Sequence, residues 1–110
     1  MMQERVFTES DWKLFRKRLP GWQESYMEGL NREYMKILSG DAKASDKFWE
    51  LEKRIREDQK KVGVQARMSR SKLLYNMVSL INEGAIDMND LEGFSDNLKE
   101  AVAVWTRQDY

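Results

Sequence analysis

The sequence contains no cysteine and no histidine, and it has only one proline and six glycines in 110 residues. Without cysteine the chain can form no disulfide and offers no thiolate nucleophile, and without histidine it lacks the commonest general base and the commonest metal ligand. We therefore predict that the protein is not an enzyme, that it holds no metal and that it uses no cofactor.

Long apolar runs are also missing. No segment approaches the roughly 20 apolar residues that a membrane-spanning helix requires, and the N-terminal MMQERVF lacks the apolar stretch of a secretory signal. We expect a cytoplasmic protein without a membrane segment.

Net charge is absent as well, because 19 Lys and Arg residues are balanced by 19 Asp and Glu residues. The protein as a whole has no field that would draw it onto phosphate or anionic lipid. Affinity for nucleic acid would therefore need a local basic patch.

What the chain does contain favours helices. Hydrophobic residues make up 41% and charged residues 35% of the sequence, a balance that is typical of a folded helical domain when proline and glycine are scarce. A chain of this length forms one domain. We predict a single all-α domain over residues 1–110, a compact bundle of about five helices.

Capping residues divide the first part of the chain into three expected helices. Thr8 predicts the start of the first helix, and Pro20 predicts its end at Leu19, because a proline disfavours helical geometry in the residue before it. A second helix can open at Pro20 and stop at Gly40. Ser45 then predicts the cap of a third helix, which carries a narrow apolar seam of Phe48, Leu51, Ile55 and Val62.

A central buried helix is predicted near residues 64–83. On a helical wheel only one narrow wedge of this segment is polar, so the helix should be covered on most sides. Gly84 predicts its end. The apolar residues that cover most of the circumference are Leu73, Leu74, Met77, Val78, Leu80 and Ile81.

The C-terminal part predicts a short turn and a last helix. Asp87 can cap a turn through Glu92, and Ser95 can cap a helix whose apolar residues are Leu98, Ala101, Val102 and Trp105. A single helix through 87–107 is the alternative, since the apolar spacing is heptad-like. Gly93 weakens a helix interior by about 1 kcal/mol, which favours the break.

A few residues fall outside the apolar stripes and are candidates for partner binding. Trp49 points about a quarter-turn away from the seam of its helix and is surrounded by charged residues, as expected of an interface anchor unless a neighbouring helix covers it. Met35 and Val104 are off their stripes in the same way. With Trp49 we group Arg67 and Arg70, which should emerge where the core ends. The expected function is a non-catalytic protein-interaction or regulatory module, which binds another protein or itself.

The alternative is a nucleic-acid-binding regulator. Its candidate phosphate-binding residues form two basic clusters, and the sequence leaves open whether these share one face. Balanced charge makes this alternative weaker than the protein-interaction hypothesis. A small-molecule pocket lined by Met27 and Met77 is a third hypothesis, although core filling explains both residues equally well. The first cluster contains Lys13, Arg16, Lys17 and Arg18, and the second contains Lys60, Lys61, Arg67, Arg70 and Lys72. The residues expected to contact phosphate are Lys13, Arg16, Lys17, Arg67, Arg70 and Lys72.

Three stretches resemble a group of short, uncharacterised bacterial proteins: RVFTESDWKLFRKRLPGWQESYMEGLNREYMKILSG, FWELEKRI and DLEGFSDNLKE. The resemblance covers nearly the whole chain. Some members of that group carry the label "multidrug transporter", which the residues here contradict because no segment is apolar enough to span a membrane. The group has no established activity, so the resemblance implies only a small free-standing domain.

Overall fold

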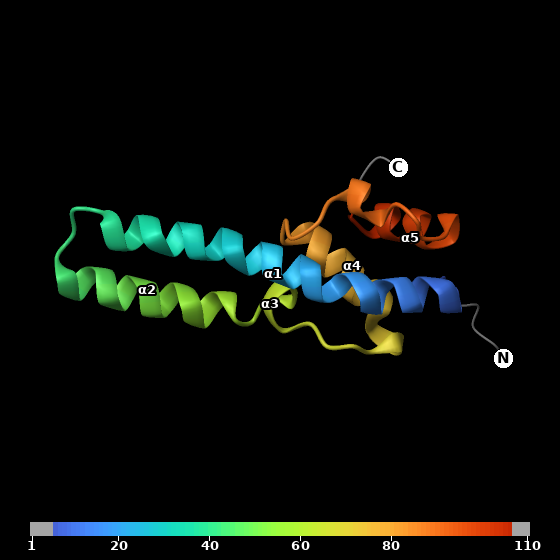
Figure 1. The fold of residues 1–110 in the computed structure, drawn as a ribbon, viewed down its shortest axis with the longest axis horizontal. Helices are drawn as coiled ribbons and strands as arrows, with labels where there is room; N and C mark the ends of the chain where they lie inside the picture. Colours follow the sequence, from blue (N-terminus) through green and yellow to red (C-terminus); the bar gives the residue numbers. More distant parts are fainter. Residues whose placement is uncertain (1–5, 107–110) are drawn as a thin grey trace.

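The protein is all-α, as the sequence predicts. The computed structural model describes residues 6–106, and within that range it contains five α-helices, two short 3₁₀ helices and no strand (Figure 1). The α-helices are α1 (Glu9–Ser39), α2 (Ala44–Asp58), α3 (Val62–Gln65), α4 (Leu73–Asn82) and α5 (Asp96–Thr106); the 3₁₀ helices are η1 (Arg70–Lys72) and η2 (Met88–Leu91).

The predicted start of α1 is confirmed, and its predicted end is wrong. Thr8 caps the helix through a capping box, in which its hydroxyl accepts the Asp11 N–H and the Asp11 carboxylate accepts the Thr8 N–H. The helix then continues through Pro20 instead of stopping at Leu19. A helix-interior proline costs about 3 kcal/mol. Burial on both sides offsets that cost, because Leu19 is fully buried and the rings of Phe15 and Trp22 meet edge to face across the proline, 6.2 Å apart.

The third predicted helix is interrupted in the structure. It begins at Ala44, without a side-chain cap, so the prediction that Ser45 caps it is wrong. It also ends at Asp58, and Val62 opens the separate helix α3. The break is stabilised from the end of α4: the Glu83 carboxylate accepts the backbone N–H groups of Val62 and Gly63, both at 2.9 Å.

The core forms around α4, which confirms the predicted central helix. Leu73, Met77 and Leu80 of α4 have no exposed surface. Their partners come from the first half of α1, from η2 and from α5. Together with those three residues the core contains Trp12, Phe15, Leu19, Ile86, Leu91, Phe94, Leu98 and Val102.

The predicted extent of this central helix, 64–83, is too long at its N-terminal end. Residues 66–69 have no regular structure, and η1 separates them from α4. Side chains satisfy the carbonyl groups that a helix would otherwise pair: Gln23 donates to the Ala66 carbonyl and Asn76 donates to the Arg67 carbonyl, both at 3.3 Å. The buried amide of Asn76 therefore fixes an irregular segment for which periodicity alone predicts a helix.

The end of α4 and the C-terminal break follow the sequence prediction. Gly84 adopts φ 79°, and the Ala85 N–H donates to the Leu80 carbonyl, the pattern of a Schellman motif. The alternative of one helix over 87–107 is wrong for the described residues, because Gly93 has φ 95° and α5 begins after Ser95. The prediction that Trp105 belongs to the apolar stripe of α5 is also wrong, because 69% of this residue is exposed.

The molecule is elongated, with a radius of gyration of 16.8 Å and extents of 58 × 26 × 23 Å. The second half of α1 and the antiparallel α2 extend beyond the core as a two-helix hairpin, which forms the left half of Figure 1. The other three α-helices gather at the opposite end, around the first half of α1. Within residues 6–106, one end of the molecule is therefore several layers thick and the other consists of two helices.

Two glycines provide a matched test of this packing. Gly63 is buried in α3, and a Cβ there would lie 2.5 Å from Cδ2 of the Tyr26 ring, so we expect Gly63→Ala to lower the free energy of unfolding by about 1–3 kcal/mol. Gly21 is inside α1, where an added Cβ would have nothing within 4 Å, and Gly21→Ala should raise that free energy by up to about 1 kcal/mol. Urea denaturation measures both. A stable Gly63→Ala variant would contradict the contact between α3 and α1.

Candidate functional site

Polar contacts join α2 to α1. The buried Asp58 carboxylate accepts the Tyr34 hydroxyl at 2.6 Å and forms ion pairs with Lys61 at 3.3 Å and Arg54 at 3.7 Å. Arg54 also pairs with Glu33 of α1 at 2.6 Å. Hydrogen bonds and ion pairs therefore fasten α2 to α1 on this side of the hairpin.

The ionisable groups between α1 and α2 pair with one another. Burial and the hydrogen bond to Asp58 raise the pKa of Tyr34 to about 12. Burial opposes ionisation of Asp58, but hydrogen bonds from Tyr34 and Lys61 outweigh it and lower the pKa of the carboxyl group. Both groups keep their ordinary charge at neutral pH, and each is already partnered, so we assign the network a structural role.

An apolar surface lies on the other side of the hairpin. At about 100° per residue, Phe48 and Ile55 lie about a quarter-turn around α2 from Arg54 and Asp58, which face α1. Phe48 is 62% exposed and Ile55 is 43% exposed. The part of the predicted apolar seam formed by Phe48 and Ile55 is therefore exposed, because Arg54 and Asp58 occupy the side of α2 that faces α1.

We call this surface the hairpin surface and define it by Phe48, Trp49 and Ile55 of α2. Trp49 is 63% exposed and meets the Phe48 ring edge to face, with ring centroids 4.9 Å apart. A shallow groove of about 270 Å³ runs along it, lined by Phe48, Leu51, Glu52, Ile55, Arg56 and Gln59. Trp49 is exposed as the sequence predicts, and so are the other off-stripe residues Met35 and Val104.

The two predicted basic clusters meet at one point. The guanidinium groups of Arg16 from α1 and Arg70 from η1 both lie over the Trp12 ring, at 5.6 Å and 5.4 Å from its centroid. Arg70 also pairs with Glu9 at 2.6 Å. Part of its charge is therefore used within the molecule, where it covers Trp12 and ties η1 to the start of α1.

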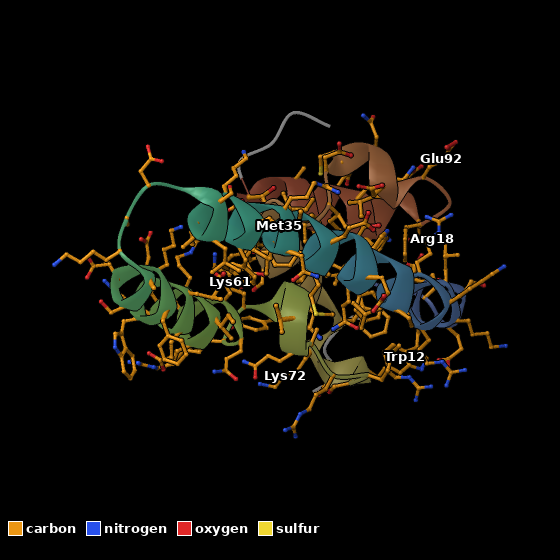
Figure 2. All side chains as sticks on the ribbon, turned by 60° about the vertical axis from the view of Figure 1, so that its left-hand side comes forward. Trp12, Arg18, Met35, Lys61, Lys72 and Glu92 are labelled. Atoms are coloured by element: carbon orange, nitrogen blue, oxygen red, sulfur yellow. The ribbon has the colours of Figure 1, made fainter. Side chains whose placement is uncertain are left out.

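The remaining cations of the first cluster take different directions. Lys13 and Lys17 are exposed on α1. Arg18 turns toward the C-terminal layer, where it donates to the carbonyls of Asp90 and Glu92 and lies over the Phe94 ring (Figure 2). Its role is to hold the loop that precedes α5.

A second groove, which we call the cationic groove, lies where the chain passes from α3 to α4. Its volume is about 510 Å³. Arg67 and Lys72, two of the predicted candidates, line it. The complete lining is Lys60, Val62, Gln65, Ala66, Arg67, Ser69, Lys72, Tyr75 and Asn76.

The structure does not place the three predicted partner-binding residues on one surface. Trp49 belongs to the hairpin surface, Arg67 lines the cationic groove and Arg70 lies over Trp12. Arg70 contacts α1 at Trp12, whereas α2 contacts α1 at Glu33. At about 1.5 Å per residue, these two positions of α1 are about 30 Å apart.

Sequence reasoning missed some of the residues that line these surfaces. It assigns Phe48 and Ile55 to a narrow apolar seam, and it does not single out Tyr75 because one tyrosine in an apolar helix gives no signal. The charged residues of α2 were the available signal: Arg54 and Asp58 compete with the seam for the side that faces α1.

Groups of acidic residues that could hold a metal ion do not occur among residues 6–106, which contain no His or Cys. No helix in the same range has both the length and the apolar character needed to cross a membrane. No protein-family model matches the chain, and neither the curated proteins nor the solved structures compared with it give a significant match. The resemblance to short bacterial proteins therefore stays a prediction.

Proposed function

We propose that this chain is a small cytoplasmic protein-interaction module without catalytic activity, and that it associates with a second copy of itself through the hairpin surface. The observation that carries this proposal is the exposure of three large apolar residues of α2, Phe48, Trp49 and Ile55, which no helix of residues 6–106 covers. Clusters of this kind mark interaction sites more often than single exposed residues do.

A second copy fits the geometry of the surface. Phe48 and Ile55 lie on either side of the midpoint of α2, so a two-fold axis at that midpoint sets Phe48 of one copy against Ile55 of the other. Such a patch is self-complementary, as a two-fold interface requires. Two hairpins joined in this way form a four-helix arrangement, a common solution for helices with one uncovered apolar face.

Trp49 is the residue whose removal should weaken this association most. Tryptophans beside an apolar patch are typical binding hot spots, which cost about 2 kcal/mol or more when truncated. We expect Trp49→Ala to raise the dimer dissociation constant by at least tenfold, measured by sedimentation over a range of protein concentrations.

Trp105→Ala is the matched control, because Trp105 is equally exposed, at 69%, but lies on α5 outside the hairpin surface. It should leave the dissociation constant unchanged. A wild-type mass of 13.1 kDa at every concentration would refute self-association. If Trp105→Ala raised the dissociation constant and Trp49→Ala did not, the interface would lie on α5 instead.

A further inference from the structure

The basic residues that line the cationic groove form no ion pair with a carboxylate of residues 6–106. Lys60, Arg67 and Lys72 line it, and no carboxylate does, although the chain as a whole has equal numbers of acidic and basic residues. Within residues 6–106 none of these three side chains forms an ion pair. A concave surface lined by one sign of charge concentrates counter-ions of the opposite sign.

Some basic residues elsewhere in residues 6–106 are paired, whereas others, such as Lys13 and Lys53, are exposed and form no ion pair. Arg56 pairs with Glu52, Arg54 with Glu33, Lys61 with Asp58 and Arg70 with Glu9, each within ion-pair distance. What distinguishes the groove is that three cations without an ion pair in residues 6–106 line the same concave surface.

An exposed aromatic ring stands among these cations. Tyr75 lies on the first turn of α4 and is 62% exposed. The Lys72 ammonium group is 5.7 Å from the centroid of its ring. A flat ring beside unpaired cations is the combination with which proteins bind nucleotides, because the base stacks on the ring while the phosphate pairs with the cations.

The groove is also held in shape before any ligand arrives. The hydrogen bonds from Gln23 to the Ala66 carbonyl and from Asn76 to the Arg67 carbonyl fix the irregular segment between α3 and η1. Arg70 anchors the far end of this segment at Trp12, which lies with Lys72 along the lower edge of Figure 2. A preorganised segment loses less conformational entropy on binding.

We propose that the cationic groove binds the phosphate and base of a nucleotide, with the base stacked on Tyr75 and the phosphate held by Lys60, Arg67 and Lys72. The volume of about 510 Å³ is within the range of small-ligand sites, about 300–1,000 Å³. The nucleotide can be free or part of a single strand. This site is independent of the hairpin surface and does not require self-association.

The experiment measures fluorescence polarisation with a labelled eight-nucleotide single strand, titrated with protein at several salt concentrations. AMP and ADP are then added as competitors. We expect binding at low salt that weakens as salt rises, since phosphate contacts release counter-ions. Displacement by millimolar AMP or ADP indicates a free nucleotide as the ligand, and binding without displacement indicates a single strand; either result supports the groove.

Variants test whether binding uses these residues. Tyr75→Ala should weaken binding by about fivefold or more, because base stacking on an aromatic side chain is worth about 1–3 kcal/mol, while Tyr75→Phe should retain it. Arg67→Gln should weaken binding and reduce the slope of affinity against salt by about one. The matched control is Lys53→Gln, which removes one exposed positive charge from α2 and should leave binding unchanged.

Three results would overturn the proposal. The first is no binding of the single strand, AMP or ADP even at low salt. The second is binding that Tyr75→Ala and Arg67→Gln leave intact. The third is equal binding of polyglutamate, which would show that charge alone is recognised. Because Tyr75 and Arg67 are exposed, both variants should fold, and their helical circular dichroism verifies this.

Discussion

Leu80→Ala is expected to lower the free energy of unfolding by about 2–5 kcal/mol, one of the largest effects of any substitution in this chain. Leu80 has no exposed surface and belongs to the core that α4 forms with α1 and α5. Truncation removes buried apolar area and leaves a cavity, because the surrounding helices relax only partly. Chemical denaturation monitored by circular dichroism gives the value.

Tyr75→Ala is the control within the same helix. Tyr75 is 62% exposed, so the substitution should change stability by no more than about 0.5 kcal/mol. Equal costs for the two variants would mean that α4 is not the central helix. The same control shows whether a loss of ligand binding in Tyr75→Ala comes from the groove rather than from unfolding.

The second large effect is expected at Asp11. This carboxylate has 2% exposure and connects the start of α1 to the start of α5: it accepts the Thr8 N–H at 2.9 Å, the Ser95 N–H at 2.8 Å and the Ser95 hydroxyl at 2.6 Å. Asp11→Ala leaves these donors without their acceptor. Because a hydrogen bond to a charged group is worth about 1.5–3 kcal/mol, we expect a loss of about 3 kcal/mol.

The control for Asp11→Ala is Asp46→Ala, which removes an exposed carboxylate from the first turn of α2. Its loss should be within about 0.5–1 kcal/mol, the usual size of a charge effect at a helix start. Ser95→Ala is informative as well, since it removes the hydroxyl and keeps the backbone donor. If Asp11→Ala and Asp46→Ala cost the same, the link between α1 and α5 is not significant for stability.

The stability contribution of Asp11 should depend on pH. Burial opposes its ionisation, but hydrogen bonds from Ser95 and Thr8 outweigh burial and hold the pKa of the carboxyl group below its ordinary value of 3.8. The folded state therefore binds the proton less tightly than the unfolded state does. The stabilisation is complete above the unfolded pKa and is lost as pH falls through the folded pKa.

Asp11→Asn isolates this effect. The difference in unfolding free energy between the wild type and Asp11→Asn should be constant near neutral pH and should shrink as pH falls below 3.8. Asp58, whose pKa is also lowered, is present in both proteins, so its titration cancels in the difference. A difference that does not change with pH would show that the pKa of Asp11 is the same in the folded and unfolded states.

The sequence predicted those features of the fold that depend on local chemistry. The Thr8 cap, the stop at Gly84, the break at Gly93 and the buried face of α4 each follow from a few neighbouring residues, and each is confirmed. The number of α-helices in residues 6–106 also agrees with the prediction, but the helices are not the same five, because local signals were contradicted at three points by distant contacts.

One point is the break between α2 and α3, which Glu83 stabilises. The other two are Pro20 and residues 66–69. A proline normally ends a helix, but here residues on both sides of it pack against one core, and their burial outweighs the missing hydrogen bond. The apolar periodicity near residue 66 predicts a helix. In the structure Gln23 and Asn76 donate to the carbonyls of Ala66 and Arg67, and this segment is irregular. None of these outcomes can be predicted without knowing which distant side chains come close.

For the candidate surfaces, too, the sequence predicted some features and the tertiary structure determined the others. Composition favours an all-helical protein and excludes disulfides and histidine chemistry. The sequence pattern indicates Trp49, Arg67 and Lys72 as candidate binding residues. Only the tertiary structure separated Trp49 from the two cations, exposed Phe48 and Ile55, and placed Tyr75 beside Lys72. The physical reason is that helix formation depends on neighbours along the chain, whereas the exposure and surroundings of a side chain depend on which helices pack against it.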